Sequence, residues 1–235
     1  MGILNETQLN RDKELAKLLG MSLNDVQNLP IASPDSIRIC SEEKAKTITP
    51  EEYYKLYSEY TYLNWPAYIR TLMKTSATRR HPELFKLLQE TKEKVCLDFG
   101  SGVGTHAIAL LENKNIVGIL DVPGQLLEFA RQRIMKRGLH HECGVYFNWM
   151  NLPDNEFDVI ICTDVLEHVE DPIKEICRIR KALKIGGLLH IQVSMMIKPS
   201  SGHFASSINK WKQAGPSYLK KYFKKEGATL WRRKK

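Results

Sequence analysis

The chain of 235 residues has no apolar run near the roughly 18 residues that a membrane-spanning helix needs. It also lacks a basic and then apolar leader, so we expect no signal peptide and a cytoplasmic protein. None of its five cysteines forms a CxxC pair, which argues against a zinc site. Because Cys96 and Cys162 fall within apolar runs, we expect both to be reduced core residues.

Acidic residues are scarce only at the C-terminal end. Residues 208–235 contain eight Lys and two Arg against the single acid Glu226, a net +9, whereas the whole chain carries +8. The first 207 residues therefore have a net charge of −1. This distribution excludes a uniformly basic nucleic-acid binder, but it leaves open a basic tail with that role. The near-helical spacing of lysines over residues 219–225 favours an amphipathic helix there.

Two regions of different pattern divide the chain. Residues 1–92 contain short helical segments, and six of the nine tyrosines lie between Tyr53 and Tyr68. Aromatic side chains with polar tips suit the wall of a small-molecule pocket, so we expect a helical region that serves as a substrate lid. Ordinary packing of these helices on the second region would explain the tyrosines equally well. Pro66 should break or kink the aromatic stretch.

Residues 93–235 alternate strand and helix patterns. Apolar runs that we expect to be strands lie at 95–97, 116–120, 144–147, 157–162 and 188–193. Helical patterns lie between them at 105–112, 125–137 and 172–183. This alternation predicts an α/β fold, with a Rossmann-like, mostly parallel sheet flanked by helices and preceded by the N-terminal helical cap.

The main chemical signal is the loop after the first of these strands, Asp98-Phe99-Gly100-Ser101-Gly102-Val103-Gly104. Glycine at every second position lets the backbone approach a ligand closely. The dinucleotide fingerprint GxGxxG would need glycine at 105, where Thr105 stands instead. The acid Asp98 disfavours a pyrophosphate and favours a cationic ligand. S-adenosylmethionine (SAM), which carries an ammonium and a sulfonium, is such a ligand.

Over about residues 93–195 the chain resembles the class I SAM-dependent methyltransferases, in their small-molecule, type 11-like branch. The resemblance rests on the Asp-x-Gly-x-Gly-x-Gly motif, on Asp121 at the end of the second strand, on the stretches 152–160 and 164–169, and on Gly186-Gly187. It implies that SAM is the cofactor. Asp98 would hold the methionine moiety, Asp121 the ribose, and Asn148 with Trp149 the adenine. The full set of implied cofactor residues is Asp98, Gly100, Ser101, Gly102, Gly104, Asp121, Asn148, Trp149 and Asp164.

The sequence departs from the family pattern in two places. Asn148 stands where the family often has an aspartate that receives the adenine amino group, although an amide oxygen can accept the same hydrogen bond. The family sheet usually ends with two more strands after the fifth. Here only residues 228–231 resemble one, so we expect one strand to be missing or supplied otherwise.

His168 and His203 are the candidate catalytic residues, because each follows a strand whose loop reaches the cofactor edge. His168 could be a general base, or it could fix the loop after the fourth strand. Resemblance to the ubiquinone-type O-methyltransferases adds Asp164, Glu167 and His168 as a magnesium set. A hard cation needs more oxygen ligands than these two carboxylates, so we assign no metal. Asp164 could also be a helix cap.

These residues together predict methyl transfer from SAM to an oxygen or nitrogen atom of a small-molecule acceptor, with no nucleic-acid or membrane partner. One alternative is an RNA or DNA methyltransferase that uses the basic tail. Another is a non-catalytic, regulatory SAM-binding protein. Residues 14–26 also resemble a helix-turn-helix, but the would-be recognition helix has no basic residue for DNA. The sequence makes no prediction of the oligomeric state.

Overall fold

The computed structural model describes residues 2–29, 43, 47–49, 51, 52, 55, 65–74, 81–147, 150–197 and 202–235. The two adenine-pocket candidates, Asn148 and Trp149, lie outside the described residues. So do the five tyrosines between residues 53 and 62.

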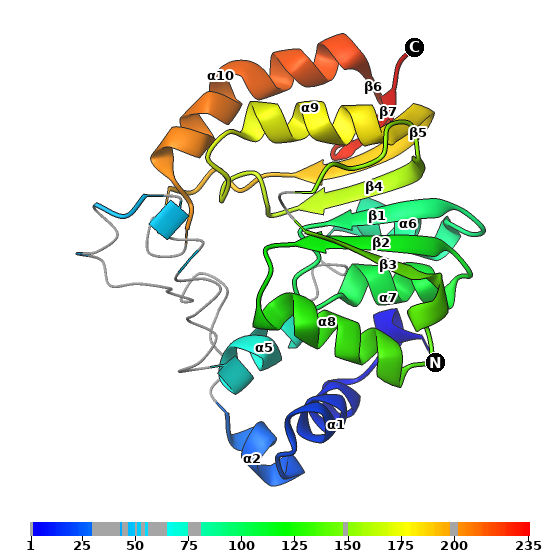
Figure 1. Ribbon diagram of the computed structural model, residues 1–235, viewed down its shortest axis with the longest axis vertical. Helices are drawn as coiled ribbons and strands as arrows, with labels where there is room; N and C mark the ends of the chain where they lie inside the picture. Colours follow the sequence, from blue (N-terminus) through cyan, green and yellow to red (C-terminus); the bar gives the residue numbers. More distant parts are fainter. Residues whose placement is uncertain are drawn as a thin grey trace.

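A seven-stranded sheet of order β3-β2-β1-β4-β5-β7-β6 forms the centre of the protein (Figure 1). Its parallel part comprises β1 (Val95–Phe99), β2 (Ile116–Asp121), β3 (Cys143–Phe147), β4 (Phe157–Thr163) and β5 (Leu183–Gln192). Every strand that the sequence predicted is present. Most of their residues are apolar because helices bury both faces of a parallel sheet. The α/β, Rossmann-like prediction is therefore confirmed.

The C-terminal hairpin completes the sheet: of the two alternatives for the last strand, missing or supplied otherwise, the second holds, because residues 223–225 supply it. β6 (Phe223–Lys225) pairs with β7 (Leu230–Arg233), which runs antiparallel to β5. α10 (Ala205–Tyr222) ends at Tyr222, earlier than the lysine spacing suggested. Over only three residues, the spacing of the lysines fits a strand as well as a helix. In this strand Phe223 is buried and Lys224 and Lys225 are exposed. Lysines on such an edge strand also hinder pairing with another chain.

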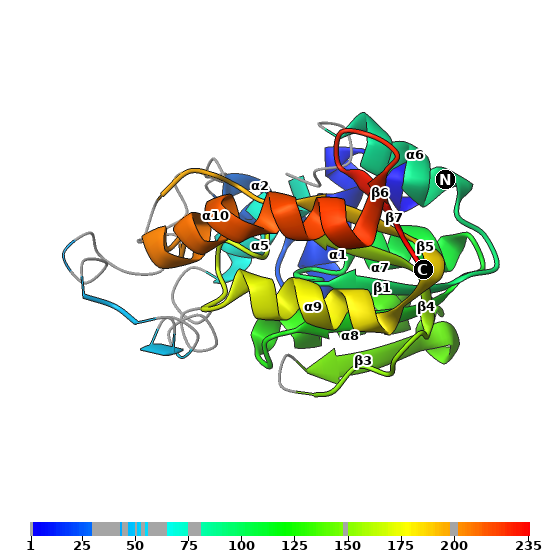
Figure 2. The same ribbon diagram turned by 90° about the horizontal axis from the view of Figure 1, so that it is seen from above.

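Helices cover both faces of the sheet (Figures 1 and 2). The 3-10 helix η1 (Ile3–Asn5), α6 (Pro82–Glu90), α7 (Thr105–Glu112) and α8 (Gln125–Lys136) share one apolar cluster with one face of β1, β2 and β4. α9 (Pro172–Ala182) and α10 cover the other face. A short 3-10 helix, η4 (His140–Glu142), precedes β3. Cys96 and Cys162 are fully buried and free, as expected, and burial raises the pKa of Cys96 to about 12.

The N-terminal helices lie on the side of α8 away from the sheet and toward the carboxyl ends of the parallel strands (Figure 1). They are α1 (Gln8–Leu19), α2 (Leu23–Asn28) and α5 (Trp65–Lys74). The side chains of Thr7 and Ser22 cap α1 and α2. Pro66 lies in the first turn of α5, where its missing N–H leaves no helical hydrogen bond unmade. No helix in the described part of the chain combines the length and the apolar character needed to cross a membrane.

Candidate active site

The glycine-rich loop, residues 100–104, leads from the carboxyl end of β1 into α7. Gly100 N and Ser101 N both donate to Leu120 O, at 2.7 and 3.0 Å, which fixes the loop to the end of β2. The φ angle of Gly100 is +80°, and a Cβ there would lie 2.3 Å from Val165 Cγ2. Any other residue at this position would therefore combine backbone strain with a steric clash.

The middle of this loop has the features of a ligand cradle. Gly102 has a φ of +51°, and apart from its chain neighbours no atom of the described residues lies within 4 Å of the position that a Cβ would occupy. The neighbouring Ser101 Oγ is buried and has no hydrogen-bond partner among the described residues, which is uncommon for a buried hydroxyl. Open space beside an unsatisfied hydroxyl fits a polar ligand such as SAM at the carboxyl ends of the strands, where open α/β sheets bind their ligands.

Asp121 ends β2 directly beside the loop. Its Oδ2 accepts from Gly102 N at 2.6 Å and its Oδ1 from Val122 N at 2.7 Å. The carboxylate therefore holds the glycine-rich loop in place and also lies at the edge of that loop. Burial raises the pKa of Asp121 to about 6, although these two hydrogen bonds favour the charged form. A buried carboxylate with lone pairs remaining can still accept from hydroxyl groups.

Asp98, near the end of β1, is 1% exposed and contacts the start of α7. Its Oδ2 accepts from Ala107 N at 3.1 Å, and its Oδ1 lies 3.6 Å from His106 Nδ1. The sequence interpretation missed His106. The position of His106 in the sequence could have indicated it, because the second residue of a helix that follows a ligand loop lies beside that loop.

Asp164 follows β4 in a left-handed conformation with a φ of +55°. Its backbone N donates to Gln192 O, and its Oδ1 accepts from Gln192 Nε2 at 3.4 Å. The alternative of a helix cap is wrong, because Asp171 caps α9 through hydrogen bonds from Ile173 N and Lys174 N. Asp164 is exposed at the carboxyl end of β4.

Both candidate histidines lie together after β4 and β5. Their rings make an edge-to-face contact with centroids 4.8 Å apart. His168 Nδ1 donates to Gly202 O and His203 Nδ1 donates to Met196 O, at 3.2 and 3.0 Å, so each ring ties a loop. Desolvation lowers the pKa of His168 to about 3, and His203 adds to that shift. A neutral imidazole of such low basicity is a weak general base near neutral pH.

Glu167 approaches the same two histidines. Ligand atoms of Glu167, His168 and His203 all lie within 4.8 Å of one another, but Asp164 does not belong to this group. The magnesium set implied by the resemblance is therefore not assembled in the described structure. One carboxylate and two imidazoles suit a hard, oxygen-seeking cation poorly, so we derive no step through a metal. Burial raises the pKa of Glu167 to about 8, and within the described part of the chain its buried Oε2 has no hydrogen-bond partner.

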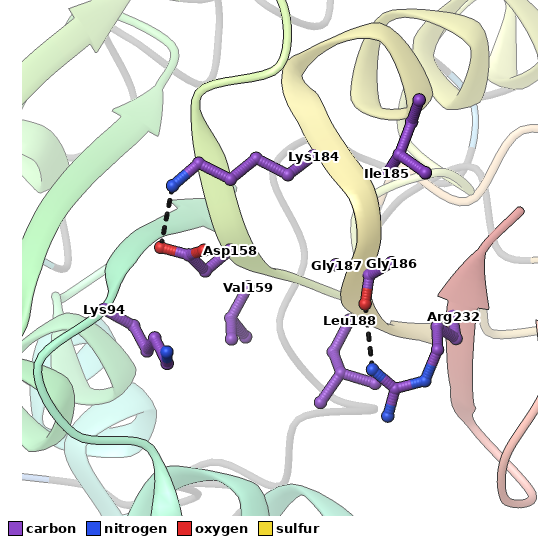
Figure 3. A pocket seen from close by; sticks show the side chains of 9 residues that line it. All are labelled: Lys94, Asp158, Val159, Lys184, Ile185, Gly186, Gly187, Leu188 and Arg232. Atoms are coloured by element: carbon purple, nitrogen blue, oxygen red, sulfur yellow. Dashed lines mark hydrogen bonds and ion pairs between the residues drawn. The ribbon is translucent and has the colours of Figure 1, made fainter. Parts of the chain in front are cut away.

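A separate hollow of about 290 Å³ lies at the opposite edge of the sheet (Figure 3). It forms where residues 184–187 leave the β4–β5 pairing, and three basic side chains reach it. Two of these are already engaged, because Lys184 pairs with Asp158 and Arg232 donates to Gly186 O. The end of the basic tail lies at this same end of the sheet, since Arg233 donates to Leu183 O at the start of β5.

Comparison with known proteins agrees with this geometry. Residues 97–191 match the family described as "Methyltransferase domain". A ubiquinone biosynthesis O-methyltransferase from Haemophilus ducreyi is 32% identical over 104 residues, which cover 42% of this chain and 44% of that protein. The enzyme of the same name from Idiomarina loihiensis is 33% identical over 96 residues, or 40% of each protein. This chain thus spans less than half the length of each of these relatives.

The solved structures that are similar to this chain include an S-adenosylmethionine-dependent methyltransferase from Mesorhizobium loti. It has 25% identity and a TM-score of 0.41, and the match covers 46% of this chain and 49% of that one. The glycine-rich loop, its acidic neighbours and the family match all fall within one segment. That segment, residues 97–191, is the part of the chain that matches the methyltransferase domain family.

Proposed function

We propose that this chain transfers a methyl group from SAM to an oxygen or nitrogen atom of a small-molecule acceptor. The observation that carries the proposal is the cradle formed by Gly102, the unsatisfied Ser101 hydroxyl and the Asp121 carboxylate at the carboxyl ends of β1 and β2. It lies within the segment that matches the methyltransferase family.

Each side chain of the cradle would have a distinct role in binding the cofactor. Asp121 would accept the ribose hydroxyls, and Asp98, with His106 beside it, would face the cationic methionine part. Gly100, Gly102 and Gly104 would let the backbone close on the ligand. Asn148 and Trp149 remain the proposed adenine contacts, and Asp164 would line the pocket from the end of β4.

The bound cofactor would supply an electrophilic methyl group for in-line transfer. Positive charge is dispersed in that step, so the protein contributes chiefly by aligning the acceptor and excluding water. His203, which is half-buried, would be the histidine nearer the acceptor, and His168 would hold it in place through their ring contact. A base is required only if the acceptor is protonated at the working pH.

The division into residues 1–92 and 93–235 belongs to the same proposal. The N-terminal region would cover the cofactor mouth and shape the acceptor pocket. What supports it is the burial of Leu15, Val26 and Ile69 against Val103 of the glycine-rich loop. The core cluster of the sheet also includes Leu84 and Leu88 of α6, so the end of this region would pack as part of the methyltransferase body.

A hydroxyl-bearing metabolite is the acceptor class that we favour. Two relatives with 32% and 33% identity are named ubiquinone biosynthesis O-methyltransferases. The first 207 residues have a net charge of −1, and the lysines and arginines of residues 220–235 lie toward the far end of the sheet from the cradle. Lys210 of the tail lies nearer the cradle, where its Nζ donates to Glu170 O after β4. A nucleic-acid acceptor would need several phosphate contacts around the cofactor mouth.

Two measurements test the proposal. Titration calorimetry should detect binding of S-adenosylhomocysteine, and incubation with methyl-labelled SAM and a cell extract should label the small-molecule fraction. Absence of S-adenosylhomocysteine binding would refute the cofactor assignment. Label in purified RNA or DNA would instead support a nucleic-acid methyltransferase, and binding without any transfer would support a regulatory protein.

A further inference from the structure

The buried guanidinium of Arg133 joins the glycine-rich loop to the N-terminal helix α1. Arg133 belongs to α8 and is 1% exposed. Its Nη1 donates to Val103 O and lies 3.2 Å from Thr105 Oγ1. Its Nη2 lies 3.0 Å from Glu14 Oε2 of α1. The side chain of Arg133 thus contacts both the glycine-rich loop and α1, which lies more than 80 residues before that loop in the sequence.

Glu14 provides the charge that Arg133 needs. A buried cation is costly unless it is paired and hydrogen-bonded. Burial lowers the pKa of Arg133, and the attraction of Glu14 opposes that effect. Burial also works against the charged form of Glu14, but Arg133 and Arg137 outweigh it and lower the pKa of this carboxyl. Among the described residues, Glu14 is the only carboxylate within ion-pair distance of Arg133.

Apolar packing reinforces the same connection. Val103, which accepts from Arg133, is buried in a cluster with Leu15 and Ala16 of α1 and Phe129 of α8. The flanking Gly102 and Gly104 have positive φ angles and no side chains. Such a backbone is conformationally permissive, so outside contacts must determine its shape.

We infer that Arg133 is a positioning residue for the cofactor loop and that Glu14 acts through it, so that docking of α1 and binding of SAM are coupled. This inference rests on the proposed cofactor role of the loop. It makes the N-terminal region a partner in cofactor binding in addition to its proposed role over the acceptor. Since coupling free energies are reciprocal, bound cofactor must also hold α1 more firmly in place.

The chain offers a matched control for Glu14. Both Glu14 and Glu6 pair with Arg137, at 2.9 and 2.8 Å, and their side chains are 15% and 11% exposed. Only Glu14 also reaches Arg133. We expect Glu14→Gln to weaken S-adenosylhomocysteine binding on the order of tenfold by calorimetry, within the usual range of allosteric coupling. Glu6→Gln should change it less than about twofold, and Glu14→Asp should restore part of the affinity.

Hydrogen exchange supplies a readout that a purely structural role of Glu14 would not change. In the wild type, S-adenosylhomocysteine should slow exchange of the α1 amides, with α6 as the reference helix. In Glu14→Gln this response of α1 should be lost, whatever the change in overall stability.

The possible results separate the two proposals. A wild type that binds no S-adenosylhomocysteine refutes the proposed function. A wild type that binds it, with equal affinities in Glu14→Gln and Glu6→Gln, overturns the coupling. If the Glu14→Gln variant does not fold, hydrogen exchange of the wild type with and without S-adenosylhomocysteine decides whether the coupling exists. Ligand protection confined to residues 100–105 would overturn the inference, and protection that extends to α1 would support it.

Discussion

At the residue scale, Asp121 holds the glycine-rich loop and faces the proposed ribose position, and both roles favour its charged form. Because burial raises its pKa to about 6, that form is lost as the pH falls below 6. We expect the affinity for S-adenosylhomocysteine to fall by up to about tenfold per pH unit below 6. Calorimetry between pH 5 and pH 8 measures this dependence.

Asp121→Asn should bind about 1–3 kcal/mol more weakly at pH 7 through lost hydrogen bonds, and it should show no such pH dependence. Asp154→Asn is the control, because Asp154 is exposed. If the Asp121→Asn variant retained both the affinity and the pH profile of the wild type, Asp121 would not belong to the cofactor site.

Glu167 allows a second residue-level prediction, on stability. Its folded-state pKa of about 8 exceeds the ordinary value of 4.5. A raised pKa gives stability that is present at low pH and lost as the pH rises to the folded-state value. Relative to Glu167→Gln, the wild type should lose up to about 1.4 kcal/mol of unfolding free energy per pH unit until pH 8, and little beyond it. Urea unfolding from pH 6 to pH 9 tests this, and parallel curves for the two proteins would contradict it.

At the scale of elements, the C-terminal hairpin is part of the fold and more than a charged tail. Arg233 of β7 donates to Leu183 O, Lys181 O and Asn155 Oδ1, so it fixes the hairpin to the start of β5. Arg233→Ala should therefore lower the free energy of unfolding by about 1–2 kcal/mol. Lys235→Ala, at an exposed chain end, should change it by less than about 0.5 kcal/mol in urea unfolding. Equal effects of the two changes would refute this role.

This structural role affects how nucleic-acid binding can be tested. Removing residues 232–235 would also remove Arg232 and Arg233, which hold Gly186 O and Leu183 O, and would disturb the sheet. Substitution of the exposed Lys220, Lys221, Lys225 and Lys235 separates charge from folding.

The elements also differ in how well the sequence predicted them. The limits of α7 match the prediction, because a glycine loop and a polar end delimit its apolar pattern. β6 was missed, since three residues are too few to display a period and only pairing with β7 makes them a strand.

At the scale of the whole molecule, charge and proposed chemistry lie at opposite edges of the sheet. The cradle lies at the carboxyl ends of the parallel strands, and the basic residues of 220–235 lie toward their amino ends. We therefore expect the rate of methyl transfer to a small acceptor to vary less than about twofold between roughly 50 and 200 mM salt. An enzyme that contacts six to ten phosphates of a nucleic acid would instead lose a factor of roughly 10³–10⁵ in affinity over the same range. Initial rates at subsaturating acceptor decide between these outcomes.

The sequence by itself determined the parallel α/β core, the glycine-rich loop and the acids Asp98 and Asp121, because these depend on local periodicity and on spacing along the chain. Only the tertiary structure brought His106 to Asp98, His203 to His168 and Glu14 to Arg133. It also decided that Asp164 caps no helix and that the lysine-rich end pairs as a strand. Contacts between residues far apart in the chain leave no periodic trace in the sequence, since they depend on which loops the sheet brings to the same edge.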